Sequence, residues 1–583
     1  MSRPSLDRPS YWHLFGVLAR GRRLRLAGLG LVLAVSSALP LAGPQLLRAF
    51  IDQVASGRSS SLWLPVGGYL LVSVVQQALS AGSAYGATHL AWIATNALRE
   101  RATRHALELD LSFHDGRSPG EMIERTDGDI SAVSSFVSSF AVQVIGNTLT
   151  MAGVLVLVLL EDWRIGLGLA GFVAVAGVTL ARLRHSAVPR AAERRAASAT
   201  LFGEIEERLT GAEDLRANGA GSYAVGRFQQ TGAALLRATV RAATATRSVY
   251  VLTLSLFAAG SALSLLAGTA LFQAGTITLG TVYLLFRYTN LLRDPLEQIS
   301  TQLQKAQDAI AGFARVQELL DERPSIRDDG QAALPPGPLA VELKRVGFAY
   351  REGAPVLEDV SLSLGPGSVL GVAGRTGSGK SSLARLLLRL ADPGEGVVRL
   401  GGVDLREARL GSLRDRVCMV TQDVQLFDAS VRDNLTLFGA QPADDGRLVE
   451  VLHRLQLGPW YRALPDGLDT RLGPGGAGVS AGEAQLVAFA RAFLRDPGLV
   501  VLDEATSRLD PVSEARIEQA VGTLLQGRTA ILIAHRLATL GRADDIVVLS
   551  RGRVVEHGRR QVLADDSTSH FARLLATASE ATR

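Results

Sequence analysis

Residues 374–382 read GRTGSGKSS, and this run has the residue types and the spacing of a loop that binds phosphate. In a G-x-x-x-x-G-K-S pattern, backbone N–H groups and a helix N-terminus surround the phosphate oxygens. Lys380 then reaches the outer phosphates, and the hydroxyl of Ser381 is available to Mg²⁺. Among the 61 Lys and Arg residues, only Lys305, Lys344 and Lys380 are lysines. The chain keeps a lysine here because a compact ammonium fits a turn around phosphate and a planar guanidinium does not.

A strand and a helix must hold this loop. The apolar run at residues 369–373 predicts a buried strand. Leu383, Leu386, Leu387 and Leu390 then recur at the spacing of one helix face. The glycines therefore lie at a strand-to-helix turn, which favours a nucleotide site over an ordinary glycine-rich turn.

A second candidate for chemistry is LVVLDEA, at residues 499–505. An apolar strand that ends in two carboxylates holds Asp503 rigidly, where it can support the Mg²⁺ shell. Glu504 is then placed to polarise an attacking water as general base. A strand followed by an acidic turn is the alternative, but together with the phosphate loop the pair indicates nucleotide hydrolysis.

A third run, VSAGEAQL at residues 479–486, opens a predicted helix. Ser480 and Glu483 have the S-x-x-E spacing of a capping box, which satisfies free N–H groups at a helix start. A glycine-bearing helix N-terminus also attracts anions, so Ser480 and Gly482 are suited to meet the outer phosphate of a nucleotide. Because the chain has one phosphate loop, that phosphate can belong to a second subunit.

The first half of the chain is predicted to span a membrane. The chain has 583 residues and is 47% hydrophobic, and its long apolar runs fall before residue 300. Six spans, each near the roughly 20 residues that a bilayer core requires, are predicted at 26–47, 62–84, 138–160, 165–182, 249–272 and 278–299. A signal peptide is rejected because the first run is too long and further spans follow it.

The loops between the predicted spans give the orientation. The N-terminal segment ends in Arg20, Arg22 and Arg23, which places it inside the cell. The second and fourth connections, at about 95–135 and 183–245, are long and rich in arginine, so both are expected in the cytosol. Both have mainly helical patterns and are interrupted by turn residues at 114–120 and 218–221. We therefore expect the spans to continue as a helical stalk, with a short helix at the far end of each loop.

Charge and cysteine content exclude two classes of function. The net charge of +5 comes from arginines beside apolar spans, so binding to nucleic acid is discounted. The single cysteine, Cys418, excludes an internal disulfide and has no metal-ligand pattern around it. The soluble half therefore has the character of a cytosolic domain.

One charge, Arg287, is predicted near the middle of the sixth span, where a charged side chain is costly. It either lines a substrate cavity that favours anionic groups, or faces a wet cavity or an internal partner without touching substrate. We favour the second reading, and the first stays open.

The second half of the chain alternates short β-type runs with helical patterns. The runs are at 340–343, 346–350, 369–373, 417–421, 499–502, 529–534 and 545–549, which predicts an α/β core with a parallel sheet and some antiparallel strands. We therefore expect a cytosolic segment at 1–23, a transmembrane domain at 24–320, a polar, Pro-rich linker at 321–339 and a nucleotide-binding domain at 340–583.

These motifs, in this order, resemble those of the bacterial half-size exporters of the ATP-binding cassette (ABC) transporter superfamily, over essentially the whole chain. The phosphate loop matches their Walker A motif, and residues 499–503 with Glu504 match Walker B. Residues 479–483 correspond to the signature motif, residues 507–510 to the D-loop, and Gln422 and His535 to the Q-loop and H-loop. Tyr350 matches the aromatic residue that stacks on adenine, and residues 109–130 resemble the first intracellular loop with its coupling helix.

The resemblance implies the fold and the ligands. The fold would be an all-α domain of six transmembrane helices with cytosolic helical extensions, followed by an α/β P-loop domain with antiparallel β and helical subdomains. Glu504, His535 and Gln422 would be catalytic, and Ser381, Gln422 and Asp503 would hold Mg²⁺, partly through water. ATP and its Mg²⁺ would be bound by Tyr350, Gly374, Arg375, Thr376, Gly377, Ser378, Gly379, Lys380, Ser381, Ser382, Asp503, Ser480, Gly482 and Asp510.

The resemblance also implies a dimer, in which the Walker A motif of one subunit and the signature of the other enclose each ATP. The signature of this chain departs from the usual L-S-G-G-Q, because it has Ala481 and Glu483. A carboxylate near phosphate weakens hydrolysis at the site that this signature completes. Pro474 also replaces a glutamate that is common in exporters. With Glu504 and His535 intact, this pattern favours a heterodimer with a second half-transporter over a homodimer.

The expected activity is ATP-driven export of an amphipathic small molecule, lipid or peptide through a bacterial plasma membrane. An importer built on the exporter fold and a nucleotide-gated channel or regulator are the alternatives, and the intact Glu504 argues against the channel. The sequence does not name the substrate.

Overall fold

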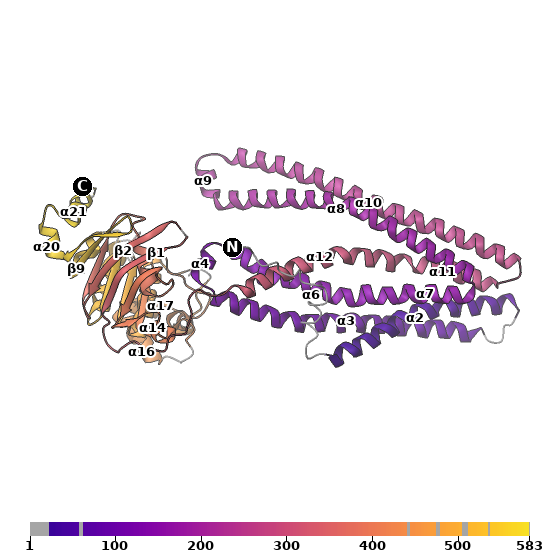
Figure 1. Ribbon diagram of the computed structural model, residues 1–583, viewed down its shortest axis with the longest axis horizontal. Coiled ribbons are helices and arrows are strands. Elements are labelled where there is room, and N and C mark those ends of the chain that lie inside the picture. Colours follow the sequence, from indigo (N-terminus) through magenta and orange to yellow (C-terminus); the bar gives the residue numbers. More distant parts are fainter. Residues whose placement is uncertain are drawn as a thin grey trace. The chain divides into compact units, whose positions relative to one another are not determined.

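The computed structural model describes residues 23–57, 62–351, 353–439, 444–473, 478–503, 511–533 and 537–581 (Figure 1). The chain divides into two compact units. The first contains Met1–Leu107 and Pro119–Glu322, and the second contains Glu108–Ser118 and Arg323–Arg583. The short insert at Glu108–Ser118 therefore belongs with the C-terminal unit, although it lies within the predicted transmembrane domain.

The first unit is helical throughout its described residues. Its long helices are α2 (Arg23–Ala55), α3 (Trp63–Glu108), α7 (Asn147–Glu161), α8 (Trp163–Thr210), α10 (Gly221–Gln273), α11 (Leu279–Leu291) and α12 (Arg293–Asp321). Shorter elements are α5 (Pro119–Ile123), α6 (Asp129–Ser139), α9 (Ala212–Ala217) and two π-helical turns at Glu124–Gly128 and Phe140–Gly146. A cluster of buried apolar residues that includes Val154, Phe257 and Tyr288 holds α7, α10 and α11 together.

Five helical stretches among the described residues are long and apolar enough to cross a membrane. They are Leu24–Ala55, Trp63–Glu108, Pro119–Glu161, Trp163–Thr210 and Gly221–Gln273, and they cover the first five predicted spans. The sixth predicted span does not form one such helix. It is divided between α11 and α12 at Leu292, where Pro295 in the first turn of α12 lacks the N–H that a continuous helix needs. The sixth crossing therefore stays a prediction.

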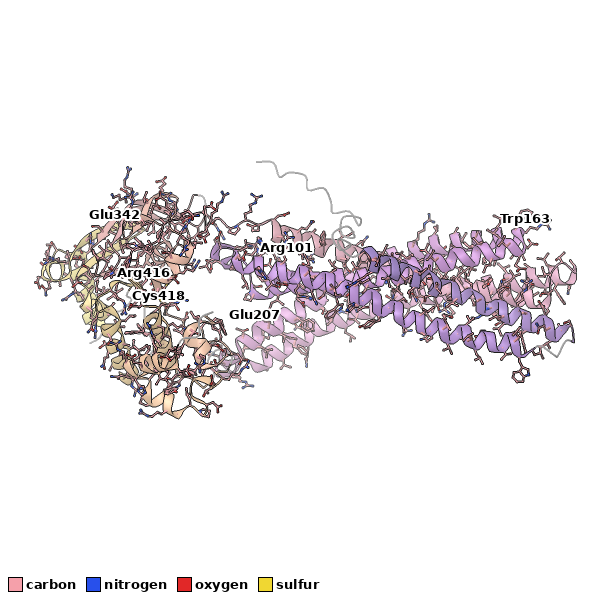
Figure 2. All side chains as sticks on the ribbon, turned by 90° about the horizontal axis from the view of Figure 1, so that it is seen from below. Arg101, Trp163, Glu207, Glu342, Arg416 and Cys418 are labelled. Atoms are coloured by element: carbon pink, nitrogen blue, oxygen red, sulfur yellow. The ribbon has the colours of Figure 1, made fainter. Side chains whose placement is uncertain are left out.

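The loops of the first unit agree with the predicted pattern. The short third connection is Asp162, whose side chain caps α8 by accepting hydrogen bonds from the N–H groups of Arg164 and Ile165. The long helices α8 and α10 run side by side and are joined by the short helix α9 (Figure 1). Trp163 lies at one end of the helical unit, and Arg101 and Glu207 lie toward the other end (Figure 2). A tryptophan at one end agrees with the aromatic residues that gather at a membrane interface.

An ion pair with a buried carboxylate and a half-exposed arginine links α6 and α12. The side chain of Asp129 on α6 is 3% exposed, and its carboxylate accepts two hydrogen bonds from the guanidinium of Arg315 on α12, one of them 2.9 Å long. Gly312, one turn earlier on α12, lets the two helices approach, because a Cβ there would lie 3.1 Å from the backbone oxygen of Asp129. This pair therefore couples α6 to α12.

The second unit contains two sheets. A six-stranded sheet has the order β10-β9-β3-β8-β7-β6, in which only β10 is antiparallel to its neighbour. Its strands are β3 (Val369–Ala373), β6 (Val417–Val420), β7 (Leu499–Asp503), β8 (Thr529–Ile533), β9 (Asp545–Ser550) and β10 (Arg553–Arg559). A four-stranded antiparallel sheet has the order β2-β1-β4-β5, with β1 (Val341–Ala349), β2 (Pro355–Leu364), β4 (Glu395–Leu400) and β5 (Val403–Asp404).

Helices complete the second unit. They are α4 (Leu111–Asp115), α13 (Lys380–Leu387), α14 (Leu410–Arg416), α15 (Val431–Thr436), α16 (Asp445–Arg454), α17 (Gly458–Ala463), α18 (Ala481–Arg495), α19 (Pro511–Leu525), α20 (Arg560–Asp565) and α21 (His570–Ala581). Short helices occur beside both predicted interruptions, α4 and α5 at residues 114–120 and α9 before residues 218–221, which agrees with the expectation of a short helix in each long loop.

The predicted strands differ from the observed ones in two ways. The runs at 340–343 and 346–350 form one strand, β1, which bends through irregular pairing between Leu343 and Val346. The strands β2, β4, β5 and β10 were not predicted. Three of them belong to the antiparallel sheet, and β10 lies at the edge of the other sheet, where its side chains alternate between half-buried and exposed. Such strands lack the continuous apolar run that marks a buried parallel strand.

Candidate nucleotide-binding site

The phosphate loop, residues 374–379, connects β3 to α13 as predicted. Gly374, Gly377 and Gly379 have φ angles of 151°, 80° and 104°, which side chains other than glycine rarely adopt. A Cβ at Gly374 would lie 2.3 Å from the carbonyl oxygen of Leu549. These glycines are therefore required by the backbone path of the loop, whose type of turn can direct N–H groups toward an anion.

Two polar side chains of the loop fit a bound phosphate. Lys380 is 4% exposed, and its ammonium donates hydrogen bonds to the carbonyl oxygens of Gly374 (2.7 Å) and Arg375 (3.0 Å). The ammonium is thus held over the loop, where phosphate oxygens would lie. The hydroxyl of Ser378 is buried and has no hydrogen-bond partner among the described residues. A buried hydroxyl without a partner is costly, and a phosphate oxygen would satisfy it.

Tyr350, at the end of β1, lies against the helix that follows the loop. Its hydroxyl is 3.1 Å from the hydroxyl of Ser382 on α13, and its ring packs edge-on against Phe348. The residue is 45% exposed, so part of its side chain is accessible to a ligand. The structure therefore brings the predicted adenine platform to the phosphate loop, although the two are 24 residues apart in the sequence.

Asp503 ends β7, close to the end of β3. In the sheet register, Val372 of β3 pairs with Ile533 of β8, and Ile533 pairs with Asp503. Adjacent strands are about 4.8 Å apart, so Asp503 lies roughly 10 Å across the sheet from the start of the phosphate loop. The carboxyl ends of parallel strands share one edge, where ligands bind in such sheets.

The geometry is consistent with a Mg²⁺ ion shared between protein and nucleotide. Ser381 is exposed at the start of α13, and Asp503 is half-buried at the end of β7, two strands from β3 in the same sheet. No group of three His, Cys, Asp or Glu side chains that could hold a metal alone occurs in the part of the chain that the structure describes. A hydroxyl and one carboxylate at this edge suit an ion whose other ligands are phosphate oxygens and water.

Gln422 is exposed in the loop after β6, and α18 holds this loop in place. Gln485 of α18 donates a hydrogen bond to the carbonyl oxygen of Thr421 (3.3 Å). Arg491 donates two to the carbonyl oxygen of Gln425 (3.1 Å each) and one to that of Asn434 (2.8 Å). Burial lowers the pKa of Arg491 below its usual value, although the guanidinium stays charged at neutral pH. The sequence reading did not single out Arg491, because an arginine on an apolar helix carries no motif.

The capping box at the start of α18 is confirmed. The Glu483 carboxylate accepts hydrogen bonds from the N–H (2.9 Å) and the hydroxyl (2.8 Å) of Ser480, and the Ser480 hydroxyl accepts one from the N–H of Glu483 (3.3 Å). Ser480 is exposed and Gly482 is buried. The negative charge of Glu483 therefore lies directly beside the signature serine.

Three predicted site residues, Glu504, Asp510 and His535, lie outside the described residues. Their roles remain predictions from the sequence. The strands that precede the two catalytic candidates, β7 before Glu504 and β8 before His535, are adjacent and parallel, and both end at the edge that carries the phosphate loop.

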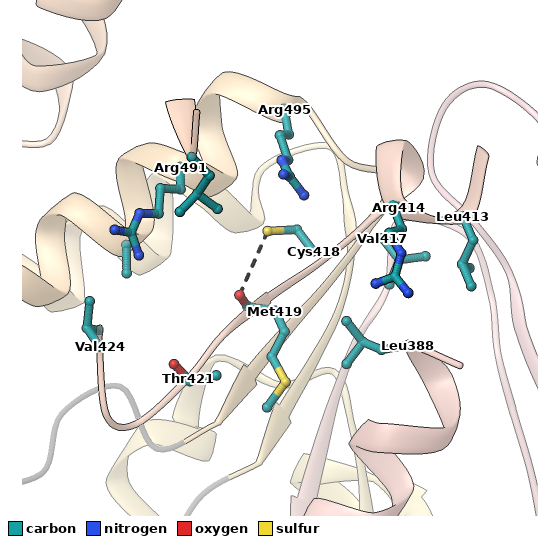
Figure 3. Close-up of a pocket in the computed structure, with 12 residues that line it drawn as sticks. Leu388, Leu413, Arg414, Val417, Cys418, Met419, Thr421, Val424, Arg491 and Arg495 are labelled. Carbon is teal, nitrogen blue, oxygen red and sulfur yellow. Dashed lines mark hydrogen bonds between the residues drawn. The ribbon is translucent and has the colours of Figure 1, made fainter. Parts of the chain in front are cut away.

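A cavity of about 220 Å³ lies behind the Gln422 loop, between β6 and α18 (Figure 3). Cys418 and Met419 line it from the strand, and Arg491 and Arg495 from the helix. The Cys418 thiol lies 3.9 Å from the carbonyl oxygen of Met419, and burial raises the pKa of this thiol. The cavity is distinct from the phosphate loop and contains none of the predicted site residues.

Two family models match the chain. The model described as the ABC transporter transmembrane region matches residues 26–296, and the model described as ABC transporter matches residues 357–507. The two matches fall on the helical unit and on the unit with the phosphate loop, respectively.

Named relatives and a solved structure agree with these matches. The chain is 33% identical over 602 aligned residues to the ATP-dependent lipid A-core flippase of Alkalilimnicola ehrlichii, covering 98% of each chain. It is 32% identical over 460 residues to the fatty acid ABC transporter ATP-binding/permease protein of Mycobacterium tuberculosis, covering 78% of this chain and 72% of that protein. Its fold is similar, with a TM-score of 0.79 and 24% identity, to a bacterial Atm1-family ABC exporter with ATP bound, covering 95% of this chain and 98% of that one.

Proposed function

Because the chain belongs to the ABC transporters, as a half-size bacterial exporter with membrane region and ATP-binding domain in one polypeptide, we propose that it moves an amphiphilic lipid across the plasma membrane by hydrolysing ATP. The observation that carries the proposal is the ammonium of Lys380 over the phosphate loop in a chain that also has apolar helices of membrane length.

The ATP site is assigned from the residues at the edge of the six-stranded sheet. The loop N–H groups, Lys380 and Ser378 hold the phosphates, Tyr350 stacks on adenine, and Ser381, Asp503 and Gln422 support Mg²⁺. Mg²⁺ neutralises phosphate charge when it is bound. Glu504 orients and deprotonates the attacking water, and His535 holds the outer phosphate. The roles of Glu504 and His535 rest on their sequence motifs, and those of the other residues rest on their position and chemistry.

The lipid substrate is inferred from the names of the relatives and from one side chain. The relatives named above are described as carriers of lipid A-core and of fatty acids, which are both lipids. On α11, Val282, Leu285 and Tyr288 are buried, whereas Arg287 is exposed. An exposed arginine on a membrane helix suits an anionic headgroup, so we assign Arg287 to substrate recognition if the lipid is acidic.

A second subunit is needed to complete each ATP site. The chain has one phosphate loop and one signature, and Ser480 is exposed, as a residue that meets a partner's nucleotide must be. The carboxylate of Glu483 beside Ser480 would repel that nucleotide's phosphate. We therefore favour a heterodimer with another half-transporter, which leaves one of the two ATP sites slow.

The oligomer is tested by mass measurement of the purified chain in detergent, with ATPase activity recorded on the same sample. A monomer, or a homodimer with weak activity, is expected if the physiological partner is another chain. A stable homodimer with full ATPase activity would rule out the need for a different partner.

The substrate class is tested by ATPase stimulation across a panel of anionic, zwitterionic and uncharged lipids in nanodiscs, with Arg287→Ala as the matched variant. We expect stimulation by anionic lipids in the wild type and a weaker response in the variant. Equal stimulation of both proteins would remove Arg287 from substrate recognition, and no stimulation by any lipid would argue against a lipid substrate.

A further inference from the structure

Arg385 on α13 joins two features that are far apart in the sequence, Tyr350 and the segment Glu108–Ser118. Its guanidinium donates a hydrogen bond to the carboxylate of Asp115 (2.8 Å) and another to the hydroxyl of Tyr350 (3.5 Å). The guanidinium carbon also lies 5.6 Å from the centre of the Tyr350 ring, within the range of a cation–π contact. One side chain therefore contacts both the adenine platform and the segment Glu108–Ser118.

The position of Arg385 on α13 ties it to the phosphate loop. It lies three residues after Ser382, on the same face of the helix, and the Tyr350 hydroxyl contacts both residues. The same helix begins with Lys380 and Ser381. A change in the Tyr350 ring or in the first turn of α13 therefore acts directly on Arg385.

The segment Glu108–Ser118 is held as a unit. The Asp110 carboxylate accepts hydrogen bonds from the N–H (2.5 Å) and the hydroxyl (2.6 Å) of Ser325. Phe113 is buried, and the Arg117 guanidinium lies 3.7 Å over its ring. By chain connection, this segment joins the predicted membrane helix α3 to the stalk elements that follow Pro119. A change in the conformation of this segment can therefore affect the membrane half.

We propose that Arg385 is a positioning residue that reports the presence of adenine on Tyr350 to the segment Glu108–Ser118 through Asp115. The inference rests on the proposed ATP site and adds a route from that site to the segment Glu108–Ser118. A base stacked on Tyr350 fixes the ring, the fixed ring restricts the Arg385 guanidinium, and the guanidinium then orders Asp115. An arginine suits this role because its planar fork can contact a carboxylate, a hydroxyl and a ring face together, which a lysine cannot.

A half-exposed ion pair often contributes little to stability, so the pair alone does not establish this role. The Arg399–Glu342 pair provides the comparison. It lies in the same unit, on the antiparallel sheet, and its arginine side chain is 36% exposed, against 34% for Arg385. Arg399→Gln therefore controls for the loss of an equally exposed arginine ion pair elsewhere in the unit.

The test uses hydrogen exchange of the full-length chain in nanodiscs, with ADP as the probe because it carries adenine and is not hydrolysed. ADP binding is measured separately by displacement of a fluorescent nucleotide. In the wild type and in Arg399→Gln, saturating ADP is expected to slow exchange in residues 109–118 by at least about fivefold. In Arg385→Gln and in Asp115→Asn, ADP is expected to bind but to leave exchange in these residues unchanged. Pyrophosphate, which lacks the base, is expected to leave it unchanged in every protein.

The outcomes separate this inference from the proposed ATP site. The role of Arg385 would be overturned if ADP still slowed exchange in residues 109–118 of Arg385→Gln and Asp115→Asn. It would also be overturned if ADP bound to the wild type without slowing this exchange. Either result would leave the ATP site intact. Slowing by pyrophosphate would show that phosphate, not adenine, is sensed, and would overturn the route through Tyr350. Failure of the wild type to bind ADP would overturn the proposed site and the inference with it.

Discussion

The hydroxyl of Tyr350 lies 3.1 Å from the hydroxyl of Ser382, so the end of β1 is tied directly to the helix that begins at Lys380. The contact joins residues that are 32 positions apart and brings an exposed aromatic ring beside the phosphate loop. The base and phosphate ends of a nucleotide can therefore be held by two neighbouring elements.

The change Lys380→Ala removes the ammonium from the phosphate loop. A hydrogen bond to a charged group contributes about 1.5–3 kcal/mol, so the dissociation constant for ATP is expected to rise roughly 10- to 150-fold. Lys344→Ala is the matched control, because Lys344 is in the same unit but is exposed and pairs with Glu342. Binding of a fluorescent ATP analogue measures both variants, and equal affinities would contradict the assignment of Lys380.

Tyr350→Ala and Tyr350→Phe separate the ring from the hydroxyl. Stacking of a base on an aromatic ring contributes about 1–3 kcal/mol, so Tyr350→Ala is expected to weaken ATP binding roughly 5- to 150-fold. Tyr350→Phe loses only the hydroxyl contacts with Ser382 and Arg385 and is expected to bind ATP almost as the wild type does. If both variants bind equally weakly, the hydroxyl and not the ring is the important group.

Glu483→Gln tests the departure in the signature. Glutamine can keep the capping box at the start of α18, so the fold is expected to be retained. An exposed charge changes its interaction energy with a nearby phosphate by up to about 1 kcal/mol. Without the carboxylate, ATP turnover of the assembled dimer is therefore expected to rise about two- to fivefold. Glu450→Gln, on the exposed face of α16, is the control for loss of a carboxylate. Unchanged or lower turnover in Glu483→Gln would show that its charge does not slow hydrolysis.

Alkylation of Cys418 reports on the cavity behind the Gln422 loop. Burial raises the pKa of this thiol, so at pH 7.5 the folded protein has less thiolate than an exposed cysteine would have. Iodoacetamide is therefore expected to react at least about tenfold more slowly with the folded chain than with the urea-unfolded chain. The alkylation rate of the folded chain should also keep rising beyond pH 9, above the ordinary cysteine pKa of about 8.5. The chain has a single cysteine, so the label has one site. Similar rates in both states would contradict the burial of Cys418.

The sequence predicted those parts of the structure that depend on local pattern. Residue type and spacing were enough to predict the phosphate loop, β7 with Asp503 and the capping box at Ser480. Each depends on a local property: glycine conformation, an apolar run or the hydrogen bonds of a helix cap. The long helices α8 and α10 and the short helices α4 and α9 also follow, because hydrophobic length and turn residues mark their ends.

Contacts between distant segments were not predictable. Nothing in the local sequence marks Asp115 as the partner of Arg385, or Asp129 as the partner of Arg315, because each pair depends on how separate elements pack. The break between α11 and α12 at Leu292 was missed because the predicted span, 278–299, was carried past Arg293, Asp294 and Pro295, which mark the interruption. The strands β2 and β10 were missed because sheets that are partly exposed alternate polar and apolar residues, which is a weaker signal than a buried run.

The most direct test is ATP-driven movement of a fluorescent lipid in proteoliposomes that contain the chain with its partner subunit, or the chain alone if it forms an active dimer. With ATP and Mg²⁺ outside, vesicles whose ATP-binding domains face outward are expected to move the labelled lipid from the outer to the inner leaflet, protected from dithionite. Vesicles that contain the Lys380→Ala variant should not move the labelled lipid. ATP hydrolysis without lipid movement, or equal movement by wild type and Lys380→Ala, would contradict ATP-driven lipid export.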